Sequence, residues 1–473
     1  MDVTRLAEAI VCRLPYEPNE QQVQVVAALA RFCCHDMVCG PDRVFVLNGF
    51  AGTGKTSLTG ALVKALTAQR VSTVLLAPTG RAAKVFGAYA GRAASTIHRA
   101  IYRHMLGGAS FGGGAPLREN NYRDTVFIVD EASMIAADEG RENILRDLIQ
   151  YIYGSHNCRL ILLGDTAQLP PVGSDESPAM NSDELRGFGL KVSRATLTQV
   201  ARQGAGSGIL ENATRLRRAQ AMTLAGKQPA IPMKLTGYDD IAIAYSDELP
   251  DMLSDAYSED GTEETVVITR SNRSATEFNQ AIRTVVLGRE ELLNPGDLMI
   301  AAKNNYFWTR RIKGLDFIAN GEILRVRSVN GTETRYGLQF ADLTFELPDN
   351  PEVAFDAKII TGCLTGYDAA LDSDSTARLY HGLMADSEVV PPGATQDECM
   401  KALRVSPYWN ALQMKFAYAV TCHKAQGGQW KNVFVDLGYV PVESSGLDYL
   451  RWLYTAVTRA RSRLYFINAP TDD

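Results

Sequence analysis

The chain has 473 residues, 46% of them hydrophobic, and a net charge of −6, which is ordinary for a globular protein of about three domains. No basic excess indicates a nucleic-acid partner, although a basic groove on an acidic body stays compatible with this balance. The eight cysteines form no CxxC pair, so we interpret them as reduced thiols of an intracellular protein. No apolar run reaches the roughly 18 residues of a membrane span, so we expect no membrane partner.

The first predicted elements are an amphipathic helix over residues 1–14 and a second helix that continues to Cys34. Pro18-Asn19 is a helix-start signal, with Asn19 as N-cap and Gln22 three residues later, the spacing of a capping box. The same Gln22 amide has a donor and an acceptor face that suit the edge of an adenine. The sequence alone leaves both interpretations open.

The stretch from residue 43 to 57 predicts a phosphate-binding loop. An apolar run from Val44 to Leu47 indicates a buried strand, and residues 57–69 have helical periodicity. Between them the chain fits G-x-x-x-x-G-K-[ST], whose glycines let backbone N–H groups approach phosphate oxygens at a helix N-terminus. The predicted nucleotide-binding residues are Gln22, Gly49, Ala51, Gly52, Thr53, Gly54, Lys55, Thr56 and Ser57.

Three further short apolar runs, at 73–77, 126–129 and 160–163, predict strands that alternate with helices in a parallel α/β sheet. Polar residues follow each run, and ligands gather at the carboxyl ends of such strands. Asp130 and Glu131 are expected to hold Mg²⁺ and to act as the general base, respectively, with the Thr56 hydroxyl as second metal ligand. Gln168 has an amide that suits a γ-phosphate sensor.

The remaining segments change in character along the chain. Residues 99–124 are rich in arginine and glycine around Phe111, which fits either an inserted hairpin or a surface loop. Residues 239–264 are acidic and predict a solvated surface. The segment 296–361 predicts short strands, with a hairpin turn at Asn330-Gly331. A polar stretch then continues to about residue 406, where the α/β pattern resumes.

The ordered motifs resemble those of superfamily 1B DNA helicases of the RecD-like and Dda-like group. The stretches that carry the resemblance are 49–57, 77–84, 95–98, 129–133, 164–172, 197–203, 418–428 and 454–460. The resemblance implies an α/β fold of two RecA-like parallel-sheet domains, with ATP and Mg²⁺ in the cleft between them. It also implies a short 1B pin insertion and an SH3-like β-barrel (2B) insertion. The expected division is 1–98 and 125–194 for domain 1A, 99–124 for 1B, 195–295 and 407–473 for 2A, and 296–406 for 2B.

The resemblance also implies roles for residues far from the phosphate loop. The catalytic set becomes Lys55, Glu131, Gln168, Arg202 and Arg459, with both arginines as arginine fingers that stabilise phosphoryl charge from the opposite wall. The expected contacts to single-stranded DNA are Thr79, Gly80, Arg81, Thr96, His98, Thr421, His423, Lys424 and Gln426. For His98 and His423, the alternative to a DNA contact is a purely structural role. Phe111 is expected at the tip of the pin.

The implied activity is ATP-dependent 5′-3′ translocation on single-stranded DNA and unwinding of forked duplexes by a monomer. One rival is a translocase that hydrolyses ATP without unwinding, and another is a DNA-binding scaffold with an inactive nucleotide site. A small-molecule kinase or GTPase would leave both arginines unexplained. For the aromatic stretch 306–308 the sequence leaves open whether it forms barrel core or a nucleic-acid surface.

Overall fold

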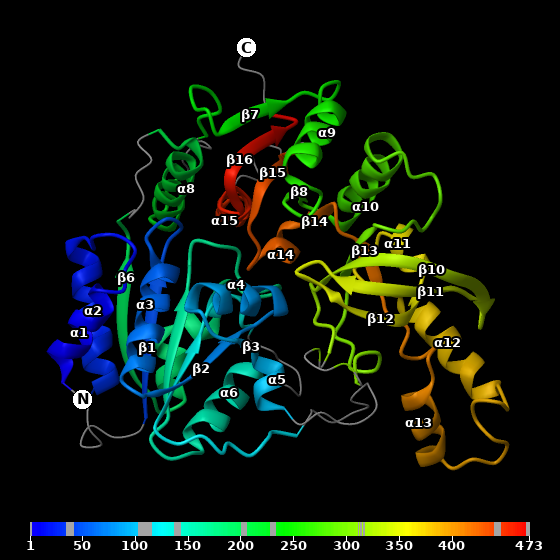
Figure 1. The fold of residues 1–473 in the computed structure, drawn as a ribbon, viewed down its shortest axis with the longest axis horizontal. Helices are drawn as coiled ribbons and strands as arrows, with labels where there is room; N and C mark the ends of the chain where they lie inside the picture. Colours follow the sequence, from blue (N-terminus) through cyan, green and yellow to red (C-terminus); the bar gives the residue numbers. More distant parts are fainter. Residues whose placement is uncertain are drawn as a thin grey trace.

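The computed structural model describes residues 2–34, 42–102, 116–136, 143–199, 206–227, 233–310, 312, 315, 317–438 and 446–469. Figure 1 shows three bodies, each built on its own sheet, with the first at the left, the second at the top and the third at the right. Arg202 and Phe111 lie outside the described residues, so the predictions made for them stay predictions.

The first sheet has six parallel strands in the order β3-β2-β4-β5-β1-β6. Its strands are β1 (Arg43–Gly49), β2 (Ser72–Ala77), β3 (Ser95–Thr96), β4 (Thr125–Val129), β5 (Arg159–Gly164) and β6 (Lys191–Leu197). The predicted parallel α/β sheet is confirmed, and β6 runs three residues beyond the expected domain boundary at 194. Neighbouring strand residues point to opposite faces, so Phe45 and Val46 enter two different cores. Because both faces are buried at the centre of the sheet, β4 and most of β1 and β5 are apolar, whereas the edge strand β6 is largely polar and only its last residue is buried.

Helices cover both faces of this sheet (Figure 1). The helices are α1 (Val3–Val11), α2 (Glu20–Cys34), α3 (Lys55–Ala68), α4 (Gly80–Ala90), α5 (Ile97–Ile101), α6 (Ile144–Tyr153) and α7 (Ser182–Gly187). Helices α1, α2 and α3 share one core with Phe45 and Leu47, whereas α5 and α6 pack on Val44 and Val46. Strand β1 and helix α3 are therefore both held by buried packing. This packing fixes the two ends of the loop that connects β1 to α3.

The second sheet has five parallel strands in the order β14-β8-β15-β16-β7. Its strands are β7 (Ile241–Ala244), β8 (Thr265–Thr269), β14 (Ala419–Thr421), β15 (Trp430–Asp436) and β16 (Ala460–Ile467). The helices of this body are α8 (Gly208–Leu224), α9 (Leu249–Asp260), α10 (Asn272–Ala281), α14 (Cys422–Ala425) and α15 (Leu447–Val457). The stretch 239–264, expected to be a solvated surface, is mostly exposed or half-buried, and it forms β7 and α9, which bury Leu253 and Ala256.

The third body is an antiparallel sheet in the order β12-β11-β10-β9-β13. Its strands are β9 (Leu298–Ala301), β10 (Ile323–Arg335), β11 (Leu338–Leu347), β12 (Asn350–Ile360) and β13 (Met414–Phe416). Leu412 bridges to Ile359 of β12, just before β13 begins, so the two ends of the sheet approach each other as in a barrel. The antiparallel sheet thus includes β13, which ends at Phe416, beyond the expected domain boundary at 406.

One expectation for this body was wrong. The hairpin turn lies at Tyr336-Gly337, both with positive φ, while Asn330-Gly331 falls within β10 at a register shift of the β10–β11 ladder. The polar stretch before residue 406, for which no helix was predicted, forms α11 (Gly362–Thr365), α12 (Ser373–Ala385) and α13 (Gln396–Val405). These helices bury a few apolar residues, among them Leu383 and Leu403, against Phe340 of the sheet.

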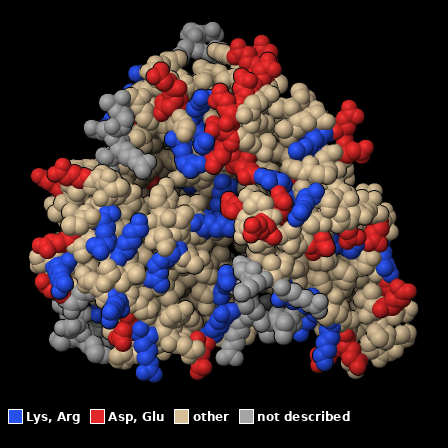
Figure 2. Space-filling view, in the orientation of Figure 1, with Lys and Arg blue, Asp and Glu red and all other residues tan. Residues whose placement is uncertain are grey.

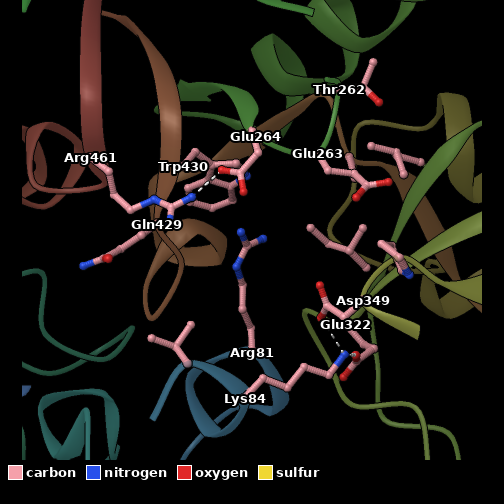
Figure 3. Close-up of a pocket in the computed structure, with 15 residues that line it drawn as sticks. Arg81, Lys84, Thr262, Glu263, Glu264, Glu322, Asp349, Gln429, Trp430 and Arg461 are labelled. Atoms are coloured by element: carbon pink, nitrogen blue, oxygen red, sulfur yellow. Dashed lines mark hydrogen bonds and ion pairs between the residues drawn. The ribbon is translucent and has the colours of Figure 1, made fainter. Parts of the chain in front are cut away.

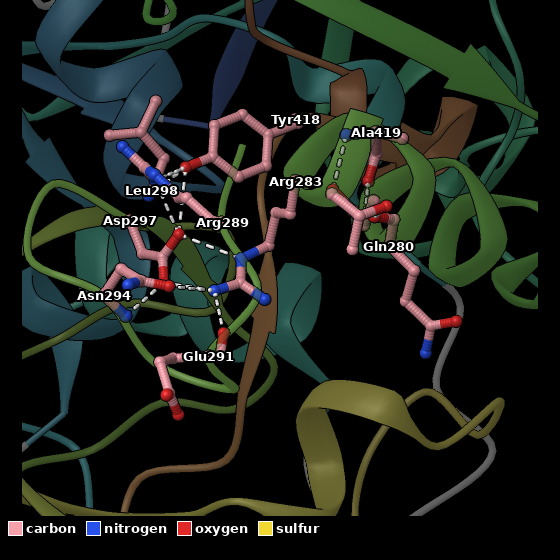
Figure 4. Close-up of polar contacts among 11 residues, drawn as sticks. Gln280, Arg283, Arg289, Glu291, Asn294, Asp297, Leu298, Tyr418 and Ala419 are labelled. Carbon is pink, nitrogen blue, oxygen red and sulfur yellow. Dashed lines mark hydrogen bonds and ion pairs between the residues drawn. The ribbon is translucent and has the colours of Figure 1, made fainter. Parts of the chain in front are cut away.

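A buried ionic network joins the third body to the second (Figure 4). The Asp297 carboxylate, with no exposed surface, accepts hydrogen bonds from Arg283 at 3.0 Å and from Arg289 at 2.6 Å. The Tyr418 hydroxyl donates to the same carboxylate at 3.2 Å. The Arg283 guanidinium also lies 4.2 Å from the centre of the Phe416 ring. One carboxylate thus neutralises cations at the root of the insertion.

We expect Asp297→Ala to lower the free energy of unfolding by about 3–5 kcal/mol, because it leaves buried guanidinium groups without a counter-charge. Urea unfolding followed by circular dichroism measures the change. Arg273→Ala is the matched control, since its pair with Glu277 on α10 is exposed and contributes little. Equal unfolding midpoints for the two variants would show that the Asp297 network does not hold the insertion.

Candidate nucleotide site and interdomain junction

The predicted phosphate loop connects β1 to α3 as the motif requires. Gly52 and Gly54 have φ values of 75° and 79°, which glycine adopts without strain. A Cβ at Gly54 would come within 2.1 Å of the Tyr16 hydroxyl, so the position has no room for a side chain. Lys55 is the first residue of α3, at the positive end of the helix. The strand, the glycine loop and the helix thus give the geometry of an anion cradle.

Carboxylates from two strand ends surround the Lys55 ammonium. Burial lowers the pKa of Lys55, but Glu131, Asp130 and Asp165 oppose it, and the net effect is a raised pKa. Burial likewise raises the pKa of Asp130 to about 6, against the attraction of Lys55. Burial is also the main reason that the pKa of Asp165 is raised. The structure therefore brings together the predicted residues of β1, β4 and β5 at one edge of the sheet.

Several buried polar atoms at this edge have no hydrogen-bond partner within the part of the chain that the structure describes. They are Oε2 of Glu131, Oε1 of Gln168 and Oγ of Ser133. Buried polar atoms are normally paired, so unpaired ones indicate a place where a bound molecule supplies the partner. Glu131 also has a positive φ of 53°, a strained conformation that often marks a functional position.

The oxygen donors of this site fit a magnesium ion. Thr56 offers a hydroxyl at the start of α3 and Asp130 a carboxylate at the end of β4. Mg²⁺ prefers oxygen ligands and is usually held by one or two protein groups together with substrate phosphates. The residues present thus suit the metal that a nucleotide would bring.

Gln22 forms the predicted capping box with Asn19. Its Oε1 accepts from the Asn19 N–H at 3.1 Å, and its own N–H donates to Asn19 Oδ1 at 2.9 Å. Its Nε2 also donates to the Thr53 carbonyl at 2.9 Å, which fastens α2 to the phosphate loop. The capping interpretation is confirmed, and the adenine contact stays a prediction.

The segment Asp165–Leu169 after β5 is bound by the second body. The Leu169 N–H donates to Thr455 Oγ1 at 2.8 Å, and Gln426 Nε2 donates to the Leu169 carbonyl at 2.7 Å. Gln220 Nε2 donates to the Ala167 carbonyl at 3.0 Å. The predicted sensor Gln168 lies in the middle of this segment, with its side-chain oxygen free. Gln426, expected at the DNA surface, is buried here between the two bodies.

Arg459 lies at the same cleft, just beyond the end of α15. Its guanidinium is buried and donates to the carbonyl groups of Thr455 at 3.0 Å and Gly428 at 3.2 Å. The positive charge of Arg459 is close enough to lower the pKa of Lys55, as the smallest of the effects acting on it. One predicted arginine finger thus lies in the second body, near enough for its charge to act on Lys55, while its own hydrogen bonds stay within that body.

The second body touches the first at the start of α4, next to the predicted DNA contact Thr79. Thr79 caps α4 by accepting from the Ala82 N–H, and Thr96 caps α5 in the same way. A Cβ at Gly427 would come within 2.9 Å of the Ala82 Cβ, so the second body touches α4 directly. His423 is exposed beside this junction, whereas the His98 ring lies 5.7 Å from that of Tyr102.

A cavity of about 240 Å³ lies where the three bodies join (Figure 3). The Arg81 guanidinium lies 3.8 Å from the centre of the Trp430 ring, and burial lowers the pKa of Arg81 to about 10. Lys84 pairs with Glu322 at 2.6 Å and with Asp349 at 3.4 Å. In this structure Arg81 and Lys84 therefore link α4 to the other two bodies. Figure 2 shows cationic and acidic side chains together around the hollow at the centre of this face.

The aromatic stretch 306–308 is half-buried. Trp308 Nε1 donates to the Asn410 carbonyl at 2.8 Å, and Tyr306 stacks on Phe317 at 4.9 Å. Phe307 lies 4.0 Å from the exposed Arg310 guanidinium. Tyr306 and Trp308 thus follow the core interpretation, while Phe307 and Arg310 remain available to a ligand.

Sequence reasoning missed three side chains that join the nucleotide edge to the second body, namely Gln220, Tyr454 and Thr455. Tyr454 and Thr455 lie in the 454–460 stretch that carried the resemblance, one to two helical turns before Arg459. Their place in this stretch, close to Arg459, is the sequence signal that could have identified them. Gln220 lies in the last third of α8 and has no local signal, because its partners, the Ala167 and Leu450 carbonyl groups, come from the first body and from α15.

Comparisons with known proteins agree with this geometry. The family described as "AAA domain" matches residues 19–229, and the "UvrD-like helicase C-terminal domain" matches residues 416–467. The ATP-dependent RecD2 DNA helicase of Deinococcus radiodurans is 26% identical over 442 residues, which are 91% of this chain and 47% of that protein. The ATP-dependent DNA helicase dda of Enterobacteria phage T4 is 25% identical over 458 residues, which are 89% of this chain and 93% of that protein.

A solved structure titled "Structural Basis for DNA Unwinding at Forked dsDNA by two coordinating Pif1 helicases" aligns with 95% of this chain and 92% of its own, at 16% identity and a TM-score of 0.49. Within the described residues, no helix is long and apolar enough to cross a membrane. The fold and the site together define a P-loop protein of two RecA-like bodies with an antiparallel insertion. The chain is therefore similar to the RecD2 and Dda helicases over most of its length, and the two family models match separate parts of it. It spans about half the length of the RecD2 protein and nearly all of Dda.

Proposed function

We propose that this protein is an ATP-dependent DNA helicase that moves 5′ to 3′ along single-stranded DNA and unwinds duplexes. The observation that carries the proposal is the junction itself. Helix α15, which leads to Arg459 in the second body, is hydrogen-bonded to the phosphate loop through Tyr454 and Ala51. The same helix is hydrogen-bonded to the segment after β5 through Thr455 and Leu169. A nucleotide bound there contacts both bodies, so its cleavage changes their separation. The direction of movement rests on the family resemblance alone.

Most of the residues proposed to bind and cleave the nucleotide belong to the first body. Lys55 and the loop N–H groups hold the phosphates, and Thr56 and Asp130 hold Mg²⁺, which neutralises phosphate charge when bound. Glu131 takes the proton of the attacking water, and Gln168 orients that water through its free amide oxygen. Arg459 and Arg202 stabilise the transferring phosphoryl group from the second body.

Single-stranded DNA is proposed to run across both α/β bodies. Hydroxyl groups and cations such as Thr79, Thr421 and Lys424 suit phosphate contacts, which hold a strand without reading its sequence. We keep the proposed division into domains 1A, 1B, 2A and 2B, with 1A extended to 197 and 2B to 416. The 1B segment is proposed to act as the pin that separates the strands.

The test uses three matched DNA duplexes with a 5′ tail, a 3′ tail or both tails. The proposal expects ATP-dependent strand separation with the 5′ tail and none with the 3′ tail alone. ATP hydrolysis stimulated by single strands without strand separation would favour the translocase. A chain that binds DNA but never hydrolyses ATP would be the scaffold.

DNA affinity is expected to depend on pH through Lys424. Burial, and to a lesser extent Lys415, lowers the pKa of Lys424 to about 8. A DNA phosphate favours the charged ammonium, so affinity is highest below pH 8 and falls as the pH rises through that value. Between pH 7 and 9 we expect a loss of about 10-fold, if contact with the phosphate restores an ordinary pKa.

Fluorescence anisotropy with a labelled single strand measures this dependence at constant salt, and the affinity should also fall steeply with added salt. Lys424→Met should flatten the pH response. Lys431→Met is the control, because Lys431 is exposed and already paired with Asp260 at 2.7 Å. An unchanged pH response in Lys424→Met would place this lysine away from the strand.

A further inference from the structure

The Tyr454 side chain crosses from the second body into the phosphate loop of the first. It lies on α15, and its hydroxyl is fully buried. The hydroxyl accepts a hydrogen bond from the Ala51 N–H at 2.8 Å and donates one to Asp165 Oδ2 at 2.8 Å. A single oxygen atom therefore joins the phosphate loop, the end of β5 and a helix of the opposite body.

Both partners of this hydroxyl belong to the nucleotide edge. Ala51 lies within the loop whose N–H groups are turned toward a phosphate, and Asp165 is one of the carboxylates that act on Lys55. The hydroxyl is a neutral donor, because burial and the nearby Asp165 raise the pKa of Tyr454 far above its ordinary value. The bond to Asp165 is thus a charge-assisted hydrogen bond, the stronger kind.

The other end of the connection is Arg459. Helix α15 continues from Tyr454 to Val457, and Arg459 follows two residues later, held by its bond to the Thr455 carbonyl. A helix of this kind is stiff over one or two turns, so a shift at Tyr454 also moves the guanidinium. The chain thus contains a short rigid path from the Ala51 N–H to the arginine finger.

We infer that Tyr454 is a positioning residue that couples the nucleotide state of the phosphate loop to the place of Arg459. An oxygen of the γ-phosphate and the Tyr454 hydroxyl are both acceptors for the Ala51 N–H. When the phosphate takes that N–H, the hydroxyl keeps only Asp165, and α15 shifts with it. This inference rests on the proposed function, since it assumes that the cleft hydrolyses a nucleotide.

Tyr454→Phe removes the hydroxyl and keeps the ring. Tyr449→Phe is the matched control, because Tyr449 lies on the same helix and stacks on Trp452 at 5.7 Å, with no part in the nucleotide edge. For both variants we would measure kcat and KM for ATP with and without single-stranded DNA. We would also measure DNA affinity with and without a non-hydrolysable ATP analogue, and the thermal midpoint.

For Tyr454→Phe we expect kcat with DNA to fall by about 10²-fold while KM changes little, because a misplaced catalytic group costs rate rather than binding. The change of DNA affinity on adding the analogue should also be lost. Tyr449→Phe should behave as the unaltered chain. A lowered thermal midpoint with normal DNA stimulation would reduce Tyr454 to a packing residue and overturn the inference.

A second measurement needs no variant. Hydrogen exchange of the backbone over 447–457 should change when the analogue binds to the unaltered chain, and an unchanged exchange pattern would contradict the coupling. Failure of the proposed function gives a different result in the unaltered chain: either it hydrolyses no ATP at all, or it hydrolyses ATP without separating the strands of a tailed duplex. The two ideas can therefore fail separately.

Discussion

Lys55→Ala is expected to abolish ATP hydrolysis, with kcat lowered by at least about 10³-fold, the scale seen for a cation that stabilises phosphoryl charge. Besides the loss of the phosphate contact, the structure gives a second reason for the loss of hydrolysis. Without the ammonium, Glu131, Asp130 and Asp165 lie close together with no cation from α3 between them. Their mutual repulsion opposes the approach of an anionic nucleotide.

Single-stranded DNA should still bind to Lys55→Ala, because the proposed DNA contacts lie on other elements. Phosphate release measures hydrolysis, and anisotropy measures DNA binding. Lys64→Ala is the control, since Lys64 lies on the same helix but is exposed. Normal turnover in Lys55→Ala would show that the loop between β1 and α3 is not the catalytic site.

Arg459→Ala is expected to lower kcat by about 10³-fold or more with only a modest change in KM, as for an arginine finger. The guanidinium comes from the body opposite the phosphate loop, so it stabilises charge that develops only as the phosphoryl group transfers. Arg459→Lys should rescue little, because a lysine cannot reproduce the planar, multidentate contact.

The control for this experiment is Arg463→Ala. Arg463 lies four residues further on in β16, is exposed and pairs with Glu259 at 2.8 Å. Removing it should leave hydrolysis unchanged. If Arg459→Ala raised KM strongly and kept kcat, the residue would bind the ground state of the nucleotide and would not act as a finger.

Strands β1, β2, β4 and β5 of the first sheet were predictable because they are buried on both faces, whereas the edge strands β3 and β6 were not predicted. Runs such as 126–129 are apolar at every position, so the signal does not depend on knowing which face packs where. The missed helices α12 and α13 give the opposite case. Their sequences are mostly polar, and few positions, such as Leu383 and Leu403, are fully buried. Such short apolar patterns become visible only when Phe340 and its neighbours cover them.

In the hairpin of the insertion, strand pairing overrides a local turn signal. Asn-Gly favours a two-residue turn, but here Asn330-Gly331 lies within β10, at a register shift of the β10–β11 ladder. The turn falls at Tyr336-Gly337, with φ of 53° and 72°, the positive values that such a turn needs. Pairing along the whole length of β10 and β11 outweighs the preference of one dipeptide.

The phosphate loop, the carboxylates after β4 and the order of the motifs were predictable from the residues alone, because each depends on residues that are neighbours along the chain. Which groups of the second body reach that edge depends on how the bodies pack. Tyr454 meets Ala51 across 403 positions of sequence, and Gln426 meets Leu169 across 257. Contacts of this kind arise from how two sheets pack, and no local pattern of residues records that.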